Sequence, residues 1–136
     1  MIGLLDTSGL IWLEREPDEA RGLAAHILEG AIAICDPVRL EVLRGARSAE
    51  AYDARADDLL GLPHVAVTPR TFERAQRIQR GLARLPGPRH ASVALPDLLI
   101  AAAAIDAELP LLHRDRHFDA IAEVTGQPTR WLGPRR

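Results

Sequence analysis

The chain has 136 residues, the size of one ordinary domain, and such a domain buries roughly two thirds of the surface that its unfolded form exposes. Hydrophobic residues make up 47% and charged residues 26%, a globular composition that excludes disordered, collagen-like and coiled-coil proteins. The longest apolar run, residues 98–105, is too short to span a bilayer, and residues 1–5 carry no basic leader. A single cysteine, Cys35, excludes an internal disulfide, so we expect a cytoplasmic protein without a membrane span.

The charged residues exclude several classes of enzyme. All 17 cationic residues are Arg, and the absence of Lys excludes a Walker P-loop and a Schiff-base enzyme. A phosphatase that uses Asp6 as its nucleophile is discounted too, because Ser8 stands where its second Asp is needed and its lysine is missing. Two Trp, one Tyr and two Phe are too few for a base-stacking RNA platform, so any nucleic acid has to be held in another way.

Short apolar runs alternate with helical patterns along the chain. The runs, each bounded by Gly, Pro or a charged residue, predict strands at residues 2–5, 31–35, 65–67, 109–113 and 129–132. Longer periodic stretches predict helices at residues 9–15, 18–29, 37–45, 49–60, 70–85 and 97–108. Because parallel strands need helical crossovers, this alternation favours an α/β fold with a parallel sheet covered on both faces, in one domain over residues 1–136.

Four acidic residues stand where such a sheet binds ligands, which is beyond the carboxyl ends of its strands. Asp6 ends the first strand, and Asp115 follows the fourth. Glu41 lies in the helix after the second strand, and Asp97 begins the Ala-rich helix. Apolar neighbours indicate that these carboxylates are partly buried, where like charges destabilise one another unless a cation or a shared proton neutralises them. Mg²⁺ and Mn²⁺ prefer carboxylate oxygens and are the cations that this pattern indicates.

Taken singly, these residues also have purely structural interpretations. Asp97 at a helix start could be a cap as well as a ligand. Glu41 near a helix start could simply interact favourably with the positive end of the helix dipole. Thr7 or Ser8 could cap the first helix. Trp12, on an early apolar helix, is interpreted as part of the core or of a groove for a partner.

Four stretches together resemble the PIN domain, and specifically the VapC-type toxin ribonucleases. They are Leu4–Ser8, Leu40–Gly45, Pro96–Ala102 and Leu112–Asp119, and the resemblance covers about residues 2–132. It implies a three-layer α/β/α fold with a parallel five-stranded sheet. It also implies an endoribonuclease that depends on Mg²⁺ or Mn²⁺, forms a homodimer or a heterotetramer, and is blocked by a VapB-like antitoxin.

The resemblance assigns roles to particular residues. Asp6, Glu41, Asp97 and Asp115 match the four catalytic acids of the family, and Asp6, Asp97 and Asp115 are its expected metal ligands. Ser8 matches a hydroxyl that lines the pocket. Asp119 is either a fifth acid or a surface residue on the following helix.

His113 marks a departure from the family pattern, which usually has Thr or Ser two residues before the fourth acid. With His117 it forms a His-x-Asp-x-His string, which is one spacing that zinc ligands adopt, although no further His or Cys motif accompanies it. Because of the departure at His113, the resemblance does not specify the hydrogen bonding around Asp115, although it still assigns the carboxylate itself.

The net charge of −2 does not favour RNA binding by itself. Leaving out the four acids expected in the pocket, 17 Arg face 15 remaining anions, so the rest of the protein carries +2. Arg89, Arg114 and Arg116 lie close to the expected site in the sequence and are candidate phosphate contacts, although any single Arg can simply solvate the surface. Two further functions stay open at this point: a PIN nuclease of RNA processing outside a toxin pair, and a catalytically silent binding module.

Overall fold

The computed structural model describes residues 1–135 and contains a five-stranded parallel sheet. The strands are β1 (Gly3–Leu5), β2 (Ile32–Cys35), β3 (His64–Val65), β4 (Leu111–His113) and β5 (Thr129–Trp131). Their order across the sheet is β3-β2-β1-β4-β5. The expected α/β fold with a parallel five-stranded sheet is confirmed.

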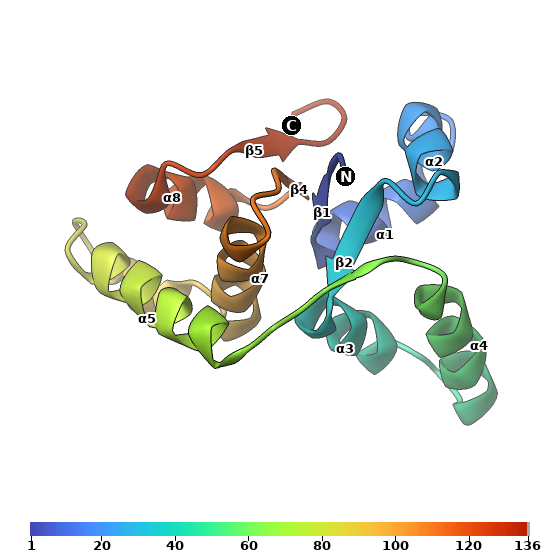
Figure 1. Ribbon diagram of the computed structural model, residues 1–136, viewed down its shortest axis with the longest axis horizontal. Helices are drawn as coiled ribbons and strands as arrows, with labels where there is room; N and C mark the ends of the chain where they lie inside the picture. The colour runs from blue at the N-terminus through green and yellow to red at the C-terminus, as the bar shows by residue number, and fades with distance from the viewer. Residues whose placement is uncertain (136) are drawn as a thin grey trace.

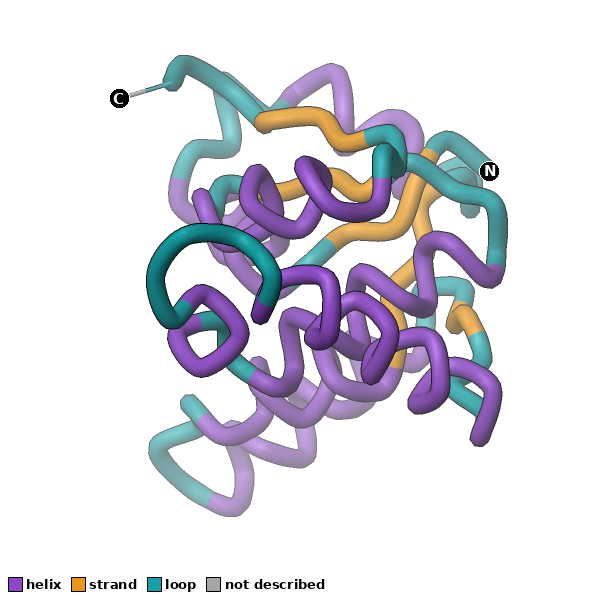
Figure 2. The backbone as a smooth tube through the Cα atoms, turned by 90° about the vertical axis from the view of Figure 1, so that its left-hand side faces the viewer, coloured by secondary structure: helices purple, strands orange, loops and turns teal. Residues whose placement is uncertain are grey.

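Helices connect the strands and cover the sheet. In chain order they are α1 (Thr7–Arg15), α2 (Arg21–Leu28), α3 (Asp36–Arg44), α4 (Ala49–Leu60), α5 (Pro69–Ala83), α6 (Arg89–Ser92), α7 (Leu95–Asp106) and α8 (Arg116–Thr125). In Figure 1, α5, α7 and α8 lie on one side of the strands and α1 and α2 on the other. Figure 2, turned by 90°, shows the strands running through the molecule among these helices.

Burial explains why the central strands form where they do. Every residue of β1, β2 and β4 is buried, as expected for parallel strands covered on both faces. In register, Leu4 of β1 lies between Ala33 of β2 and Leu111 of β4. No helix within residues 1–135 has the length and apolar character needed to cross a membrane.

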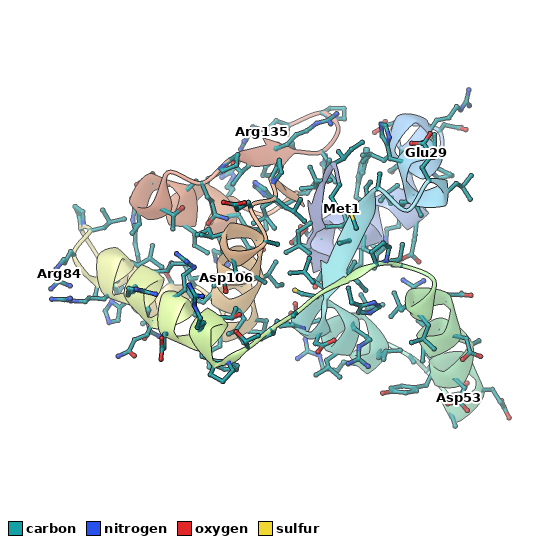
Figure 3. All side chains as sticks on the ribbon, in the orientation of Figure 1. Met1, Glu29, Asp53, Arg84, Asp106 and Arg135 are labelled. Carbon is teal, nitrogen blue, oxygen red and sulfur yellow. The ribbon has the colours of Figure 1, made fainter. Side chains whose placement is uncertain are left out.

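Polar contacts and close packing hold α5 against α7 and α8. Thr71 and Arg74 of α5 both donate to the Asp106 carboxylate, at 2.9 and 2.5 Å. Figure 3 labels Asp106, the last residue of α7. At Gly81 a Cβ atom would lie only 2.2 Å from a methyl carbon of Val124, so glycine allows α5 to approach α8 this closely.

Several boundaries differ from the sequence prediction. The first helix begins at Thr7 rather than at residue 9, because Asp6 caps it. The third strand is His64–Val65 rather than 65–67, since its pairing ends where Cys35 of β2 meets Val65. Two helices lie outside the predicted helix ranges: the short α6, which follows Pro88, and α8, which follows Asp115.

The order of the strands determines at which point of the sheet a ligand is expected to bind. After β1 the chain adds β2 and β3 on one side, and β4 and β5 then add on the other side of β1. Ligands of open α/β sheets bind at this reversal, beyond the carboxyl ends of the strands. Asp6 follows β1 there, and Asp115 follows β4.

Candidate metal-dependent nuclease site

Asp6 is the N-cap of α1 and is almost fully buried, at 2% exposure. Its carboxylate accepts hydrogen bonds from the backbone N–H of Gly9 at 2.8 Å and of Ser8 at 3.2 Å. The Ser8 hydroxyl donates to the same carboxylate at 2.7 Å and accepts from the backbone N–H of Arg114 at 3.0 Å. Ser8 therefore links the end of β1 to the end of β4. The alternative that Thr7 or Ser8 caps this helix is wrong.

Thr7 instead positions the second acid. Its hydroxyl donates to Glu41 Oε1 at 2.7 Å, across 34 residues of sequence, and thereby joins the start of α1 to α3. Sequence reasoning missed this role, because a Thr directly after a strand is equally typical of a cap.

Asp97 is the third residue of α7, whose N-cap is Ala94. Its carboxylate does not cap the helix: Oδ2 lies 3.2 Å from Nδ1 of His117, at the start of α8. The interpretation of Asp97 as a helix cap is therefore wrong.

Asp115 is the N-cap of α8 and accepts a hydrogen bond from the backbone N–H of His117 at 2.9 Å. The ring of His117 turns back toward it, with Nδ1 3.7 Å from Asp115 Oδ1. One donor atom each from Asp97, Asp115 and His117 lies within 4.8 Å of the other two. The structure thus brings His117 into the group, a residue that the sequence pattern had suggested only as part of a zinc string.

Burial and mutual repulsion both act on these carboxyl groups. Burial raises the pKa of Asp6 to about 7; the hydrogen bonds from Ser8 and Gly9 oppose this change, and the charge of Asp97 adds to it. Burial likewise raises the pKa of Asp97 to about 6, opposed by the hydrogen bond from His117 and increased by the charges of Asp115 and Glu41. A divalent cation bound here would relieve both costs, and oxygen-rich ligand sets are those that Mg²⁺ and Mn²⁺ prefer.

His113 lies in the core instead of the acidic group. Its ring is fully buried and packs against Phe118 and Trp131, with ring centroids 5.2 and 5.6 Å away. Nδ1 accepts a hydrogen bond from the backbone N–H of Asp115 at 3.1 Å, and burial lowers the pKa of the imidazole. The His-x-Asp-x-His string therefore does not assemble into a zinc site.

The three arginines suggested for phosphate contact have different surroundings. Arg89 forms an ion pair with Glu123 at 3.0 Å. Arg114 donates to the backbone carbonyls of Leu132 and Pro134, and its guanidinium lies over the largely buried ring of Trp12. Arg116, the first residue of α8, is exposed.

Asp119 pairs with Arg135 at 2.9 Å, and its nearer carboxylate oxygen lies 4.0 Å from His113 Nε2. These contacts connect α8 to the segment after β5. The structure thus gives Asp119 a pairing role at this place in the fold, and its role as a fifth acid stays a prediction.

Comparison with known proteins identifies the family. Residues 3–124 match the model described as the PIN domain. The chain is 45% identical over 135 residues to Ribonuclease VapC18 of Mycobacterium tuberculosis, an alignment that covers 99% of this chain and 98% of that protein. The chain belongs to the PIN-domain family, among the VapC ribonucleases. This VapC-type chain is also 38% identical over 134 residues to Ribonuclease VapC2 of the same species, covering 97% of the chain and 93% of the relative.

Solved structures agree with the fold of this PIN domain. A DNA-bound VapBC complex from Salmonella typhimurium matches with a TM-score of 0.76 at 17% identity and covers 98% of this chain and all of that chain. VapBC2 from Rickettsia felis bound to a promoter DNA fragment matches with a TM-score of 0.74 at 20% identity, with the same coverage. At these identities the likeness concerns the fold.

Proposed function

We propose that this protein is a metal-dependent endoribonuclease and the toxin of a type II toxin–antitoxin pair. The observation that carries the proposal is that Asp6, Glu41, Asp97 and Asp115 come from separate parts of the chain and yet lie close enough for the charge of Asp97 to act on Asp6, and those of Asp115 and Glu41 on Asp97. Two of these carboxyl groups have a raised pKa, which is typical of a site built for an opposing charge rather than for stability.

Asp6, Asp97 and Asp115 would hold Mg²⁺ or Mn²⁺, with Glu41 as the fourth acid. When bound, such a cation makes a coordinated water more acidic and stabilises the negative charge that develops on a phosphodiester. The protein's own residues fix the ligands: Ser8 and the N–H groups of α1 orient Asp6, and Thr7 orients Glu41. Such preorganisation reduces the cost of assembling the site when substrate arrives.

RNA would be bound through its phosphates. Arg116 is exposed beside Asp115 and is the best placed of the three suggested cations. Arg89 and Arg114 would have to contribute while engaged with Glu123 and with backbone carbonyls. We therefore expect removal of Arg116 to weaken RNA binding more than removal of Arg89.

A VapB-like antitoxin is the proposed partner, on the strength of the identity to VapC ribonucleases. A groove between α1, α3 and α4 leads up to Glu41 and supplies a surface from which a partner would reach the site. Its lining combines apolar and charged side chains: Ile11, Glu14, Arg15, Glu41, Val42, Gly45, Ala46, Arg47, Ala51 and Arg55.

Cleavage of single-stranded RNA tests the activity. The wild-type protein should cut in Mg²⁺ or Mn²⁺ and stop in EDTA. Asp6→Asn and Asp97→Asn should each abolish cutting while remaining folded, whereas Asp18→Asn, a change at an exposed carboxylate, should cut like wild type. Wild-type rates in either site variant would contradict the assignment.

Expression of the gene with its neighbouring reading frame tests the partner. A small protein encoded immediately upstream should co-purify with the untagged chain and inhibit cleavage when added back. If no such protein co-purifies and the chain still cuts RNA, the result would instead favour the alternative of an RNA-processing nuclease.

A further inference from the structure

A nitrogen donor stands among the carboxylates of the proposed metal site. His117 Nδ1 lies 3.2 Å from Asp97 Oδ2 and 3.7 Å from Asp115 Oδ1. The other histidine of this segment, His113, is directed into the core, with Nδ1 accepting from the backbone. His117 is therefore the histidine to be considered for this site.

The fold holds His117 in this place through its backbone. It is the second residue of α8, and its N–H donates to the Asp115 carboxylate that caps the helix. Its side chain is 43% exposed, so the ring is accessible to ions from solvent. Asp97, on the facing helix α7, has a side chain that is only 12% exposed. The group therefore combines a largely buried carboxylate with a histidine that solvent can reach.

The spacing of the donor atoms is that of neighbouring ligands around one ion. Two ligands at right angles, each about 2.1 Å from an octahedral cation, are about 3.0 Å apart, and opposite ligands are about 4.2 Å apart. The distances of 3.2 and 3.7 Å from His117 fall within this interval. In the neutral tautomer that carries its proton on Nε2, Nδ1 offers a lone pair toward the same space.

We propose that His117 Nδ1 is a metal ligand together with Asp97 and Asp115, and that this nitrogen makes the site prefer Mn²⁺ to Mg²⁺. The inference rests on the proposed function and deepens it by naming the ion. Both ions bind carboxylate oxygens, but Mg²⁺ dehydrates reluctantly and keeps to oxygen ligands, whereas Mn²⁺ is a transition metal and accepts an imidazole nitrogen more readily than Mg²⁺ does. An all-carboxylate site would lack this discrimination.

The competing explanation is that His117 serves only as a hydrogen-bond partner that offsets the charge of Asp97. Both explanations predict contact between the two side chains, and both predict that losing His117 alters activity. They differ in whether nitrogen is bonded directly to the ion. The decisive measurement must therefore report on coordination.

Electron spin-echo envelope modulation of the full-length protein with Mn²⁺ alone, without RNA, provides that measurement. Wild type should show modulation from a directly coordinated ¹⁴N, and labelling histidine with ¹⁵N should replace it. His117→Asn should bind Mn²⁺ without the nitrogen signal. His26→Asn is the matched control, because His26 is 41% exposed and its Nδ1 lies 3.5 Å from a Glu29 carboxylate oxygen; this variant should keep the signal.

Competition between the two ions gives a second readout. His117→Asp replaces the nitrogen donor by an oxygen donor and should lower the ratio of Mn²⁺ to Mg²⁺ affinity, because only Mn²⁺ loses a ligand that it accepts more readily than Mg²⁺ does. We expect a fall of about tenfold, the low end of the changes in metal affinity that alterations around a metal site produce. Mn²⁺ binding by wild type without a nitrogen signal, or an unchanged affinity ratio in His117→Asp, would overturn the inference while leaving the proposed function intact. Absence of any Mn²⁺ or Mg²⁺ binding would overturn both.

Discussion

Replacing Asp6 by Asn should stabilise the metal-free protein, although Asp6 is central to the proposed site. The side chain is 2% exposed, and burial raises the pKa of its carboxyl group to about 7 from an ordinary 3.8. Asn removes the charge but retains an oxygen that can accept from Gly9, and Asn is as good an N-cap as Asp. The variant therefore loses the cost of a buried charge and keeps the cap.

The magnitude follows from the two pKa values. At about 1.4 kcal/mol for each pH unit between them, ionised Asp6 reduces the free energy of unfolding by about 4 kcal/mol above pH 7. Because the folded-state pKa is raised, the native protein binds more protons than the unfolded chain between about pH 4 and pH 7. Wild-type stability in EDTA should therefore fall as the pH rises through this window, and the Asn variant should show a smaller fall.

Urea unfolding in EDTA at about pH 4.5 and about pH 8 measures both effects. The Asn variant should have the higher midpoint at about pH 8, and its advantage should shrink at about pH 4.5. Asp18→Asn, a change at an exposed carboxylate, should stay within about 0.5 kcal/mol of wild type at both values. A lower midpoint for Asp6→Asn than for wild type at about pH 8 would refute the argument that burial of this charge is costly.

Three further changes test the packing and the ligands of the site. Gly9→Ala places a Cβ atom 2.8 Å from a methyl carbon of Leu5 and 3.0 Å from the carbonyl oxygen of Leu112. Urea denaturation should therefore show a free energy of unfolding lower by about 1–3 kcal/mol, and RNA cleavage should be slower because the start of α1 is displaced. Gly126→Ala puts a side chain at a φ of 67° in open space, and thermal melts should show a loss of about 1 kcal/mol with RNA cleavage unchanged. In EDTA, Asp97→Ala should unfold at a urea midpoint similar to that of wild type or slightly above it. In Mg²⁺ its midpoint should be the lower of the two, because only wild type gains the free energy of metal binding. A midpoint lowered equally in both buffers would contradict a ligand role.

Much of the fold could be predicted because its signals are local. The central strands β1, β2 and β4 coincide with short apolar runs, because strands buried on both faces are apolar at nearly every position. The bounds of α4 agree with the prediction, with Ser48 accepting from the N–H of Ala51 at its start and Gly61 following its end. The sequence predicts the start of α1 too late, because an Asp at the end of a strand resembles a ligand as much as it resembles a helix cap.

The site was predictable as far as strand ends determine it. Asp6 and Asp115 follow neighbouring strands, so their proximity follows from topology alone. The contacts of Thr7 with Glu41 and of His117 with Asp97 depend on how α1 meets α3 and how α8 meets α7, and no local pattern encodes these angles. The only sequence signal for His117 is its place in the His-x-Asp-x-His string, two residues after Asp115.

The order of the strands also sets when the proposed site can exist. Ribosomes add residues from the N-terminus, and β1 acquires its neighbour β4 only after 106 residues have followed Leu5. A nascent chain therefore carries Asp6 and Glu41 long before Asp97 and Asp115 have been synthesised, and pairing across such a separation is slow. If the proposed site is correct, a nascent chain would therefore be unable to cut RNA until Asp97 and Asp115 have been synthesised.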